Sequence, residues 1–290
     1  MTRLAMLIGV LASTLATTSI STSAPAQNAP LWRSVDVARQ LRDSLPLRVR
    51  VRYAAGKVDV RPGADPLLYA MHLRYDETRA VPLHLYDAQQ RSALLGLESH
   101  GSSRRPSSRD DEAGELRVAL PRMLPLDLDF EFGGTQAALE LGDMTLQSVH
   151  MDCGAADATL LFSKPNRIRM RELEVNVGAA DFAALHLANA NADQLRVQAG
   201  IGGVDLDFGG AWTRDLSVVA RLAIGKLTLR VPPDVGVRLE VQRVATEFEH
   251  ENLVKRDDAW YSDNWDRAQH RLRIRAETFF GKIEVQHSAR

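Results

Sequence analysis

The chain has 290 residues, a formal net charge of −1 and an apolar share of 45%. This length can hold one large all-β domain or two small ones, and the apolar share is sufficient for a hydrophobic core. The near-zero net charge argues against nucleic-acid binding, which needs a basic surplus or a basic face, so we expect no nucleic-acid partner.

The first thirty residues are typical of an export signal. Arg3 is their only charge, and the run LAMLIGVLASTLA is apolar and short. The tripeptide APA at 24–26 offers a small-x-small cleavage site, so residues 1–26 are predicted to be a signal peptide that is cut after Ala26. An uncut anchor is the alternative, although the run is short for a bilayer. No later segment has 18 consecutive apolar residues, so we expect an exported chain, periplasmic or extracellular, without a transmembrane helix in its mature form.

Two regions are predicted after the signal peptide. Residues 33–97 form a small β-rich N-terminal unit, in which the stretch SVDVARQLRDSL fits either a short helix or an edge strand. Residues 98–115 are rich in Ser, Arg, Asp and Gly, which is typical of a disordered linker. Residues 116–287 then carry a repeat.

The repeat is marked by the tetrapeptide GAAD, which occurs at 154–157 and again at 178–181. Alignment on its third residue gives anchors every 21 to 24 residues, with further copies near both ends of the chain: Gly56, Thr135, Ala156, Ala180, Gly202, Gly225 and Gly281. Seven residues before each anchor stands an apolar side chain: Val49, Leu128, Val149, Leu173, Leu195, Val218 and Ile274. Apolar and polar residues alternate around these positions, which predicts strands with one buried face.

Each repeat is therefore predicted to be a strand, a tight turn and a second strand. We expect an all-β fold, a β-solenoid of stacked two-strand repeats of roughly 23 residues, in which neighbouring repeats bury one another's apolar faces. An ordinary antiparallel sandwich is the alternative. Glycines that allow a sharp bend are predicted at the turns: Gly56, Gly154, Gly178, Gly202, Gly225 and Gly281. Residues 245–269 break the period and are predicted to be an insertion or a decorated loop.

Three segments carry a resemblance to a known family. They are VRVRYAAGKVDVRPGADPLLYAMHLRYD, LAIGKLTLRVPPDVGVRLEV and FGKIEV. The chain resembles the toast-rack proteins, which pair a small N-terminal domain with a domain like the C-terminal part of the cell-wall-active-antibiotics response protein LiaF. The adhesin-like β-solenoid families are related to them. The resemblance implies a β-solenoid that contacts partners in envelope-stress signalling, and it carries no catalytic residues. LiaF-like proteins have transmembrane helices before this domain, whereas this chain shows only a signal sequence.

Few residues of the sequence point to catalysis or to metal binding. The chain has no Walker loop, GxSxG elbow or HExxH motif, and its eight histidines show no metal-ligand spacing. We therefore expect no catalytic residue, no cofactor and no metal site. Cys153 is the only cysteine, which excludes an internal disulfide. It stands in an apolar column, so we expect it to be buried and unreactive.

Acidic residues gather on two predicted strand faces. One face carries Asp205 and Asp207; the other carries Asp127, Asp129 and Glu131. Parallel β-helix enzymes that act on polysaccharides use such acids, so a carbohydrate-active enzyme working through Asp205 and Asp207 is one alternative. A solvated strand face is the simpler interpretation. Another acidic pair, Asp157 and Asp181, shares a column in adjacent repeats, where the two carboxylates would splay into water or share a cation.

Three aromatic residues cluster near the C-terminus. Trp260, Tyr261 and Trp265 are flanked by Asp and Asn, as expected either for a surface that binds a sugar or peptide or for a cap on the end of the core. Together the patterns predict an exported, non-enzymatic interaction module of the cell envelope, linked to the envelope-stress response. Its expected partner is an envelope protein or a glycan. The carbohydrate-active enzyme and a surface adhesin are the alternatives.

Overall fold

The computed structural model describes residues 30–64, 66–99, 114–179 and 181–288, and these form an all-β structure. Leu31–Arg290 form one compact unit. The predicted signal peptide, linker residues 100–113 and the anchor Ala180 lie outside the described residues. The strands are β1 (Trp32–Gln40), β2 (Leu47–Pro62), β3 (Leu67–Asp76), β4 (Ala80–Asp87), β5 (Ser92–Ser99), β6 (Glu115–Leu120), β7 (Pro125–Glu140), β8 (Thr145–Cys153), β9 (Asp157–Leu161), β10 (Met170–Ala179), β11 (Phe182–Leu185), β12 (Ala192–Asp207), β13 (Leu216–Val231), β14 (Gly236–His250), β15 (Leu253–Arg256), β16 (Ala259–Ser262) and β17 (Arg271–His287).

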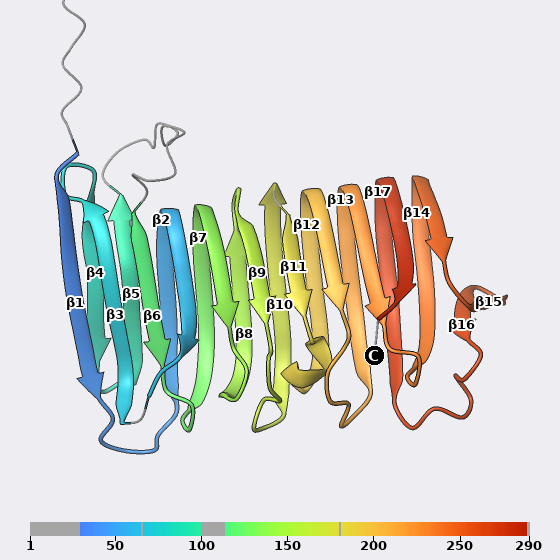
Figure 1. Cartoon of the computed structure of the whole chain (residues 1–290), viewed down its shortest axis with the longest axis horizontal. Helices are drawn as coiled ribbons and strands as arrows, with labels where there is room; N and C mark the ends of the chain where they lie inside the picture. Colours follow the sequence, from blue (N-terminus) through green and yellow to red (C-terminus); the bar gives the residue numbers. More distant parts are fainter. Residues whose placement is uncertain (1–29, 65, 100–113, 180, 289–290) are drawn as a thin grey trace, which may run out of the picture. The chain divides into compact units, whose positions relative to one another are not determined.

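Strands from consecutive repeats pair in parallel and in register. The residues seven positions before the anchors are direct ladder neighbours: Val49, Leu128, Val149, Leu173, Leu195, Val218 and Ile274. Figure 1 shows these strands side by side. The sequence alternation predicts an apolar column, and the structure contains it: each of these residues lies beside the residue at the same position of the next repeat.

The bends differ between repeats. The sequence predicts two strands separated by a turn, and this holds where β8 is followed by β9 and β10 by β11. In β12, β13 and β17, however, one strand runs through the anchor. In these three strands the anchor is a glycine with positive φ, such as Gly202 (φ 137°), which turns the chain while its neighbours keep their pairing to the next repeat. β7 and β14 run through their anchors with threonine there, so the glycine is one of two ways to form this bend.

The C-terminal strand does not end the ladder. β17 lies between β13 and β14 and pairs in parallel with both, as Figure 1 shows. The prediction of an insertion over 245–269 is wrong at its start, because residues 245–250 belong to β14, a further repeat with Thr246 opposite Gly281. The remainder forms the antiparallel hairpin β15–β16, which pairs with β14.

The N-terminal part joins the same ladder. β2 pairs in parallel with β7 on one side and with β5 and β6 on the other. β1 pairs antiparallel with β3, so the edge-strand interpretation of the stretch after Ser34 is confirmed and the helix is wrong. The helix found among the described residues is the short 3₁₀ segment η2 (Leu187–Ala190). No helix in that part of the chain is long and apolar enough to cross a membrane.

The core is lined by the apolar columns. Phe130, Met151, Val175 and Val197 are at most 1% exposed, whereas Gln198, one residue further on, is exposed. Successive side chains of a strand point to opposite faces, so this contrast fixes which face each column occupies.

Candidate functional site

Each repeat presents one polar side chain on its outer face shortly before the bend. These side chains are direct ladder neighbours, here called the rim row: Arg52, Glu131, Asp152, Asn176, Gln198, Arg221 and Glu277. Neighbouring strands lie about 4.8 Å apart, so the row forms a line of evenly spaced polar groups across the strands.

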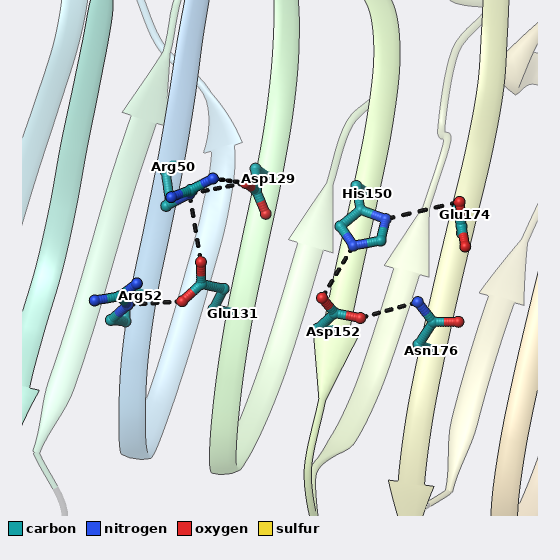
Figure 2. Close-up of polar contacts among 8 residues, drawn as sticks. All are labelled: Arg50, Arg52, Asp129, Glu131, His150, Asp152, Glu174 and Asn176. Atoms are coloured by element: carbon teal, nitrogen blue, oxygen red, sulfur yellow. Dashed lines mark hydrogen bonds and ion pairs between the residues drawn. The ribbon is translucent and has the colours of Figure 1, made fainter.

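Most of the rim row is paired internally, and Figure 2 shows the first four members. Arg52 Nε lies 2.7 Å from Glu131 Oε2, and Arg221 Nε lies 2.8 Å from Glu277 Oε2. Asn176 Nδ2 donates to Asp152 Oδ1 at 2.9 Å.

Three members of the row have further or missing partners. Glu131 Oε1 also lies 3.3 Å from Arg50 Nε. Asp152 Oδ2 lies 2.9 Å from His150 Nε2, as Figure 2 also shows. Within the described part of the chain, Gln198 makes no side-chain hydrogen bond. The ionic groups of the row are thus largely compensated, and its centre is polar with little net charge.

A groove of about 960 Å³ runs along the rim row from β2 to β17. Its floor consists of small residues two positions before the anchors, called here the floor column: Ala54, Gly133, Gly154, Gly178, Gly200 and Ala223. The backbones of neighbouring strands lie very close together there. A Cβ on Gly133 would lie 2.1 Å from the Ala54 oxygen, and one on Gly178 would lie 2.5 Å from the Gly154 oxygen. At Gly133 and Gly178 this crowding excludes a side chain, and no position of the floor column holds a residue larger than alanine. The channel above it is called here the bend groove.

Exposed apolar side chains follow the C-terminal half of the bend groove. Ile201, Ile224 and Phe280 are ladder neighbours and are 56%, 46% and 53% exposed. Phe279, 59% exposed, lines the groove beside them. These four residues are called here the apolar ridge. Three of them form a continuous row of exposed apolar side chains, and such patches on soluble proteins commonly mark a binding surface.

The three predicted aromatic site residues fall into two groups. Trp260 packs against the core, with its ring centroid 4.4 Å from His250 and 5.2 Å from Phe248. Tyr261 contacts Trp265 instead, at 5.5 Å. The Tyr261–Trp265 pair is surrounded by the guanidinium groups of Arg238, Arg256, Arg271 and Arg273.

The predicted acidic residues are held by other groups of the protein. Asp205 Oδ2 lies 2.5 Å from Arg230 Nη2, and burial raises the pKa of Asp205 despite this cation. Asp207 accepts hydrogen bonds from the backbone of His186 and Gly209 and from the Ser288 hydroxyl. On the other face, Asp127 accepts from Ser148 and Arg171, Asp129 pairs with Arg50, and Glu131 pairs with Arg52.

The carboxylate of Asp181 also has a structural contact. Its Oδ1 accepts a hydrogen bond from the backbone N–H of Gly203 at 2.8 Å. This contact holds the turn between β10 and β11 to the next repeat. Of the acidic pair Asp157 and Asp181, Asp181 therefore has a structural role.

The six predicted turn glycines occupy two columns. Four stand at the anchor and have positive φ: Gly56, Gly202, Gly225 and Gly281. Gly154 and Gly178 stand two residues earlier and belong to the floor column. The groove was not predicted from the sequence, although the small residue two positions before every anchor except Gly281 is the signal that marks it.

Two protein-family models match the chain. The N-terminal domain of toast_rack matches residues 33–171, and the C-terminal domain of LiaF, described as cell wall-active antibiotics response, matches residues 185–285. The chain belongs to the toast-rack family. The first match spans the predicted linker and extends through β9 to the start of β10. The LiaF-like match includes β12, β13, β14 and most of β17.

Solved structures with a similar arrangement are described as adhesion proteins. A candidate cell adhesion protein from Clostridium sporogenes is 13% identical, with a TM-score of 0.47, and the match covers 88% of this chain and all of that one. A candidate adhesin from Bacteroides fragilis is 8% identical, with a TM-score of 0.38, covering 87% and 97%. One from Parabacteroides distasonis is 10% identical, with a TM-score of 0.35 and the same coverage. No curated protein matches the sequence.

Proposed function

We propose that this toast-rack protein is an exported, non-enzymatic interaction module of the cell envelope that takes part in the response to envelope stress. The stress role is supported by the LiaF-like match over residues 185–285. Export is supported by the apolar N-terminal run followed by APA at 24–26.

The observation that carries the non-enzymatic part is the engagement of Asp205 and Asp207. A glycosidase needs one carboxylic acid free to give its proton to the leaving group and one free carboxylate. Asp205 is paired with Arg230, and Asp207 holds three hydrogen bonds that join β12 to its surroundings. Both acids are therefore engaged by other groups of the protein, one in an ion pair and one in hydrogen bonds, which supports binding rather than hydrolysis.

The fold supports the same role. We interpret the parallel ladder as a β-solenoid of two-strand repeats, because in-register pairs such as Leu173 with Leu195 and Leu195 with Val218 lie one repeat apart. Such a fold presents the same outward position again and again along its length, and repeat proteins use surfaces of this kind for binding.

The test compares hydrolysis with retention. The full chain and the double variant Asp205→Asn with Asp207→Asn are incubated with polysaccharides, and released reducing ends are measured. Both proteins are also sedimented with envelope fragments from the bacterium that encodes them. We expect no release of reducing ends and equal retention of both proteins on the fragments. Release by the wild-type chain that the double variant loses would establish the enzyme instead.

A further inference from the structure

We propose that the bend groove binds an uncharged, extended glycan chain lying across the strands. This inference rests on the proposed function, since it names the ligand of an interaction module. Its first support is shape. The floor column and the rim row continue over β2, β7, β8, β10, β12 and β13, so the channel is long, open and repetitive. An extended polymer matches such a channel better than a compact ligand does.

The second support is charge. Arg52 is neutralised by Glu131 and Arg221 by Glu277, at 2.7 and 2.8 Å. Asp152 and Glu98 also line the groove, so a polyanion would meet repulsion there, and among the described lining residues no unpaired cation compensates for it. The charge pattern therefore favours a ligand without ionic groups.

The third support is the hydrogen-bonding capacity at the centre of the groove. Asp152, Asn176 and Gln198 are consecutive ladder neighbours. Asn176 uses one N–H on Asp152, so its oxygen is open to a donor, and Gln198 offers both an acceptor and two donors. Hydroxyl groups donate and accept at once, so a row of sugar hydroxyls complements a carboxylate followed by two amides.

The fourth support is the apolar ridge beside these polar groups. Ile224 and Phe280 are about half exposed, and Phe279 lines the same channel. A sugar ring has an edge of hydroxyls and a face of C–H groups. The polar side chains of the lining, together with Phe279 in the same lining, therefore fit the two aspects of one sugar chain.

An extended peptide is disfavoured by the backbone of the groove. Peptides that add to sheets bind through unpaired main-chain groups at an edge. The groove crosses the strands instead, and its floor is already bonded: Gly154 N–H donates to the Phe132 oxygen at 2.8 Å and Ala179 N–H to the Gly154 oxygen at 2.9 Å. Recognition must therefore come from side chains.

The test measures binding of neutral hexasaccharides of N-acetylglucosamine, glucose and mannose to the full chain by titration calorimetry. We expect at least one to bind, and Gln198→Ala and Asn176→Ala each to weaken it by about five-fold, the effect of one lost hydrogen bond. Phe279→Ser should weaken it similarly, because Phe279 is the ridge residue that lines the groove. The matched control is Gln194→Ala, which removes an outward glutamine from the same strand outside the groove lining and should bind as wild type.

Other outcomes overturn the proposal. These are binding of none of the three sugars, equal affinity of Gln198→Ala and Gln194→Ala, or tighter binding of polygalacturonate or of an extended peptide. Retention on envelope fragments is measured in the same preparation. Retention without sugar affinity would overturn the groove assignment alone, whereas loss of both would overturn the proposed function as well. Circular dichroism of each variant checks that the fold is kept.

Discussion

Gly281 lies directly beside Gly225 in the parallel ladder of β17 and β13, and both have positive φ, 129° and 142°. A Cβ on Gly281 would lie 1.8 Å from the Gly225 oxygen, and a Cβ on Gly225 would lie 1.8 Å from the Gly202 oxygen. The three glycines thus form a column in which the backbone of each repeat occupies the place of a side chain of the next.

Gly225→Ala should therefore destabilise the protein by at least ~1–3 kcal/mol, since alanine at this φ is strained even without the contact. The control is Gly134→Ala, whose Cβ would meet only the Ala155 oxygen at 3.9 Å, so its stability should be unchanged or slightly higher. Urea denaturation measures both. Equal urea midpoints for the two variants would contradict the close packing of the glycine column.

Val197→Asp should unfold the ladder or come close to it. Val197 is 1% exposed and lies between Val175 and Ala220, so the new carboxylate would be buried without a partner. That costs several kcal/mol, a large part of a typical domain stability of about 5–15 kcal/mol. Gln198→Asp places the same group on the outer face beside Arg221 and should be nearly silent. Similar midpoints for the two variants would show that the faces are assigned wrongly.

The apolar columns could be predicted from the sequence because alternation and spacing are local properties. Leu173 and Leu195 reveal their pairing by position alone, and the structure makes them neighbours. The position of β17 could not be predicted in this way. Its apolar residues suit any repeat equally, so the period does not say that β17 lies between β13 and β14. β14 was missed as a repeat, although Thr246 stands at the anchor position as Thr135 does in β7.

The bend groove could not be predicted for a different reason. It depends on how closely neighbouring backbones approach, as at Gly178 and Gly154, and strand alternation carries no information about that distance. The separation of Trp260 from the Tyr261–Trp265 pair could not be predicted either. Trp260 and Tyr261 are adjacent in β16 and so point to opposite faces, which only a firm strand assignment reveals.

Cys153 should react slowly with thiol reagents in the native protein. It is 6% exposed, and burial, helped by the nearby Asp152 carboxylate, raises the pKa of its thiol to about 12. Only roughly 10⁻⁴ of the thiol is ionised at pH 8, and the thiolate is the reactive form. Native labelling should be at least about 100-fold slower than labelling in urea, and its rate should rise about tenfold per pH unit between pH 7 and 10. A native rate that levels off near pH 9 would rule out this environment.

Thr278→Val should stabilise the protein by about 1 kcal/mol. Thr278 is 2% exposed, and within the described residues its hydroxyl has no hydrogen-bond partner, which is costly in a core. Thr145→Val is the matched control, because the Thr145 hydroxyl donates to the Arg122 oxygen at 2.7 Å. Loss of that bond should cost about 1 kcal/mol. Thermal or urea unfolding should thus move in opposite directions for the two variants, and a shift in the same direction would argue against an unsatisfied hydroxyl.

Trp260→Ala should cost more stability than Trp265→Ala, because only Trp260 packs against the core at the β14 end of the ladder, on Phe248 and His250. A half-buried tryptophan should lose about 2–3 kcal/mol, less than the 3–5 kcal/mol of a fully buried one. Trp265 is also half-buried, but it contacts Tyr261 and two arginines outside the core, and such contacts are worth about 1 kcal/mol. Urea midpoints decide the order, and a larger loss for Trp265→Ala would show that the end of the core is closed by the Tyr261–Trp265 pair instead. If the expected order holds, Trp265→Ala remains folded. Its retention on envelope fragments then tests whether this pair, with its four surrounding arginines, contributes to partner binding as the sequence predicts.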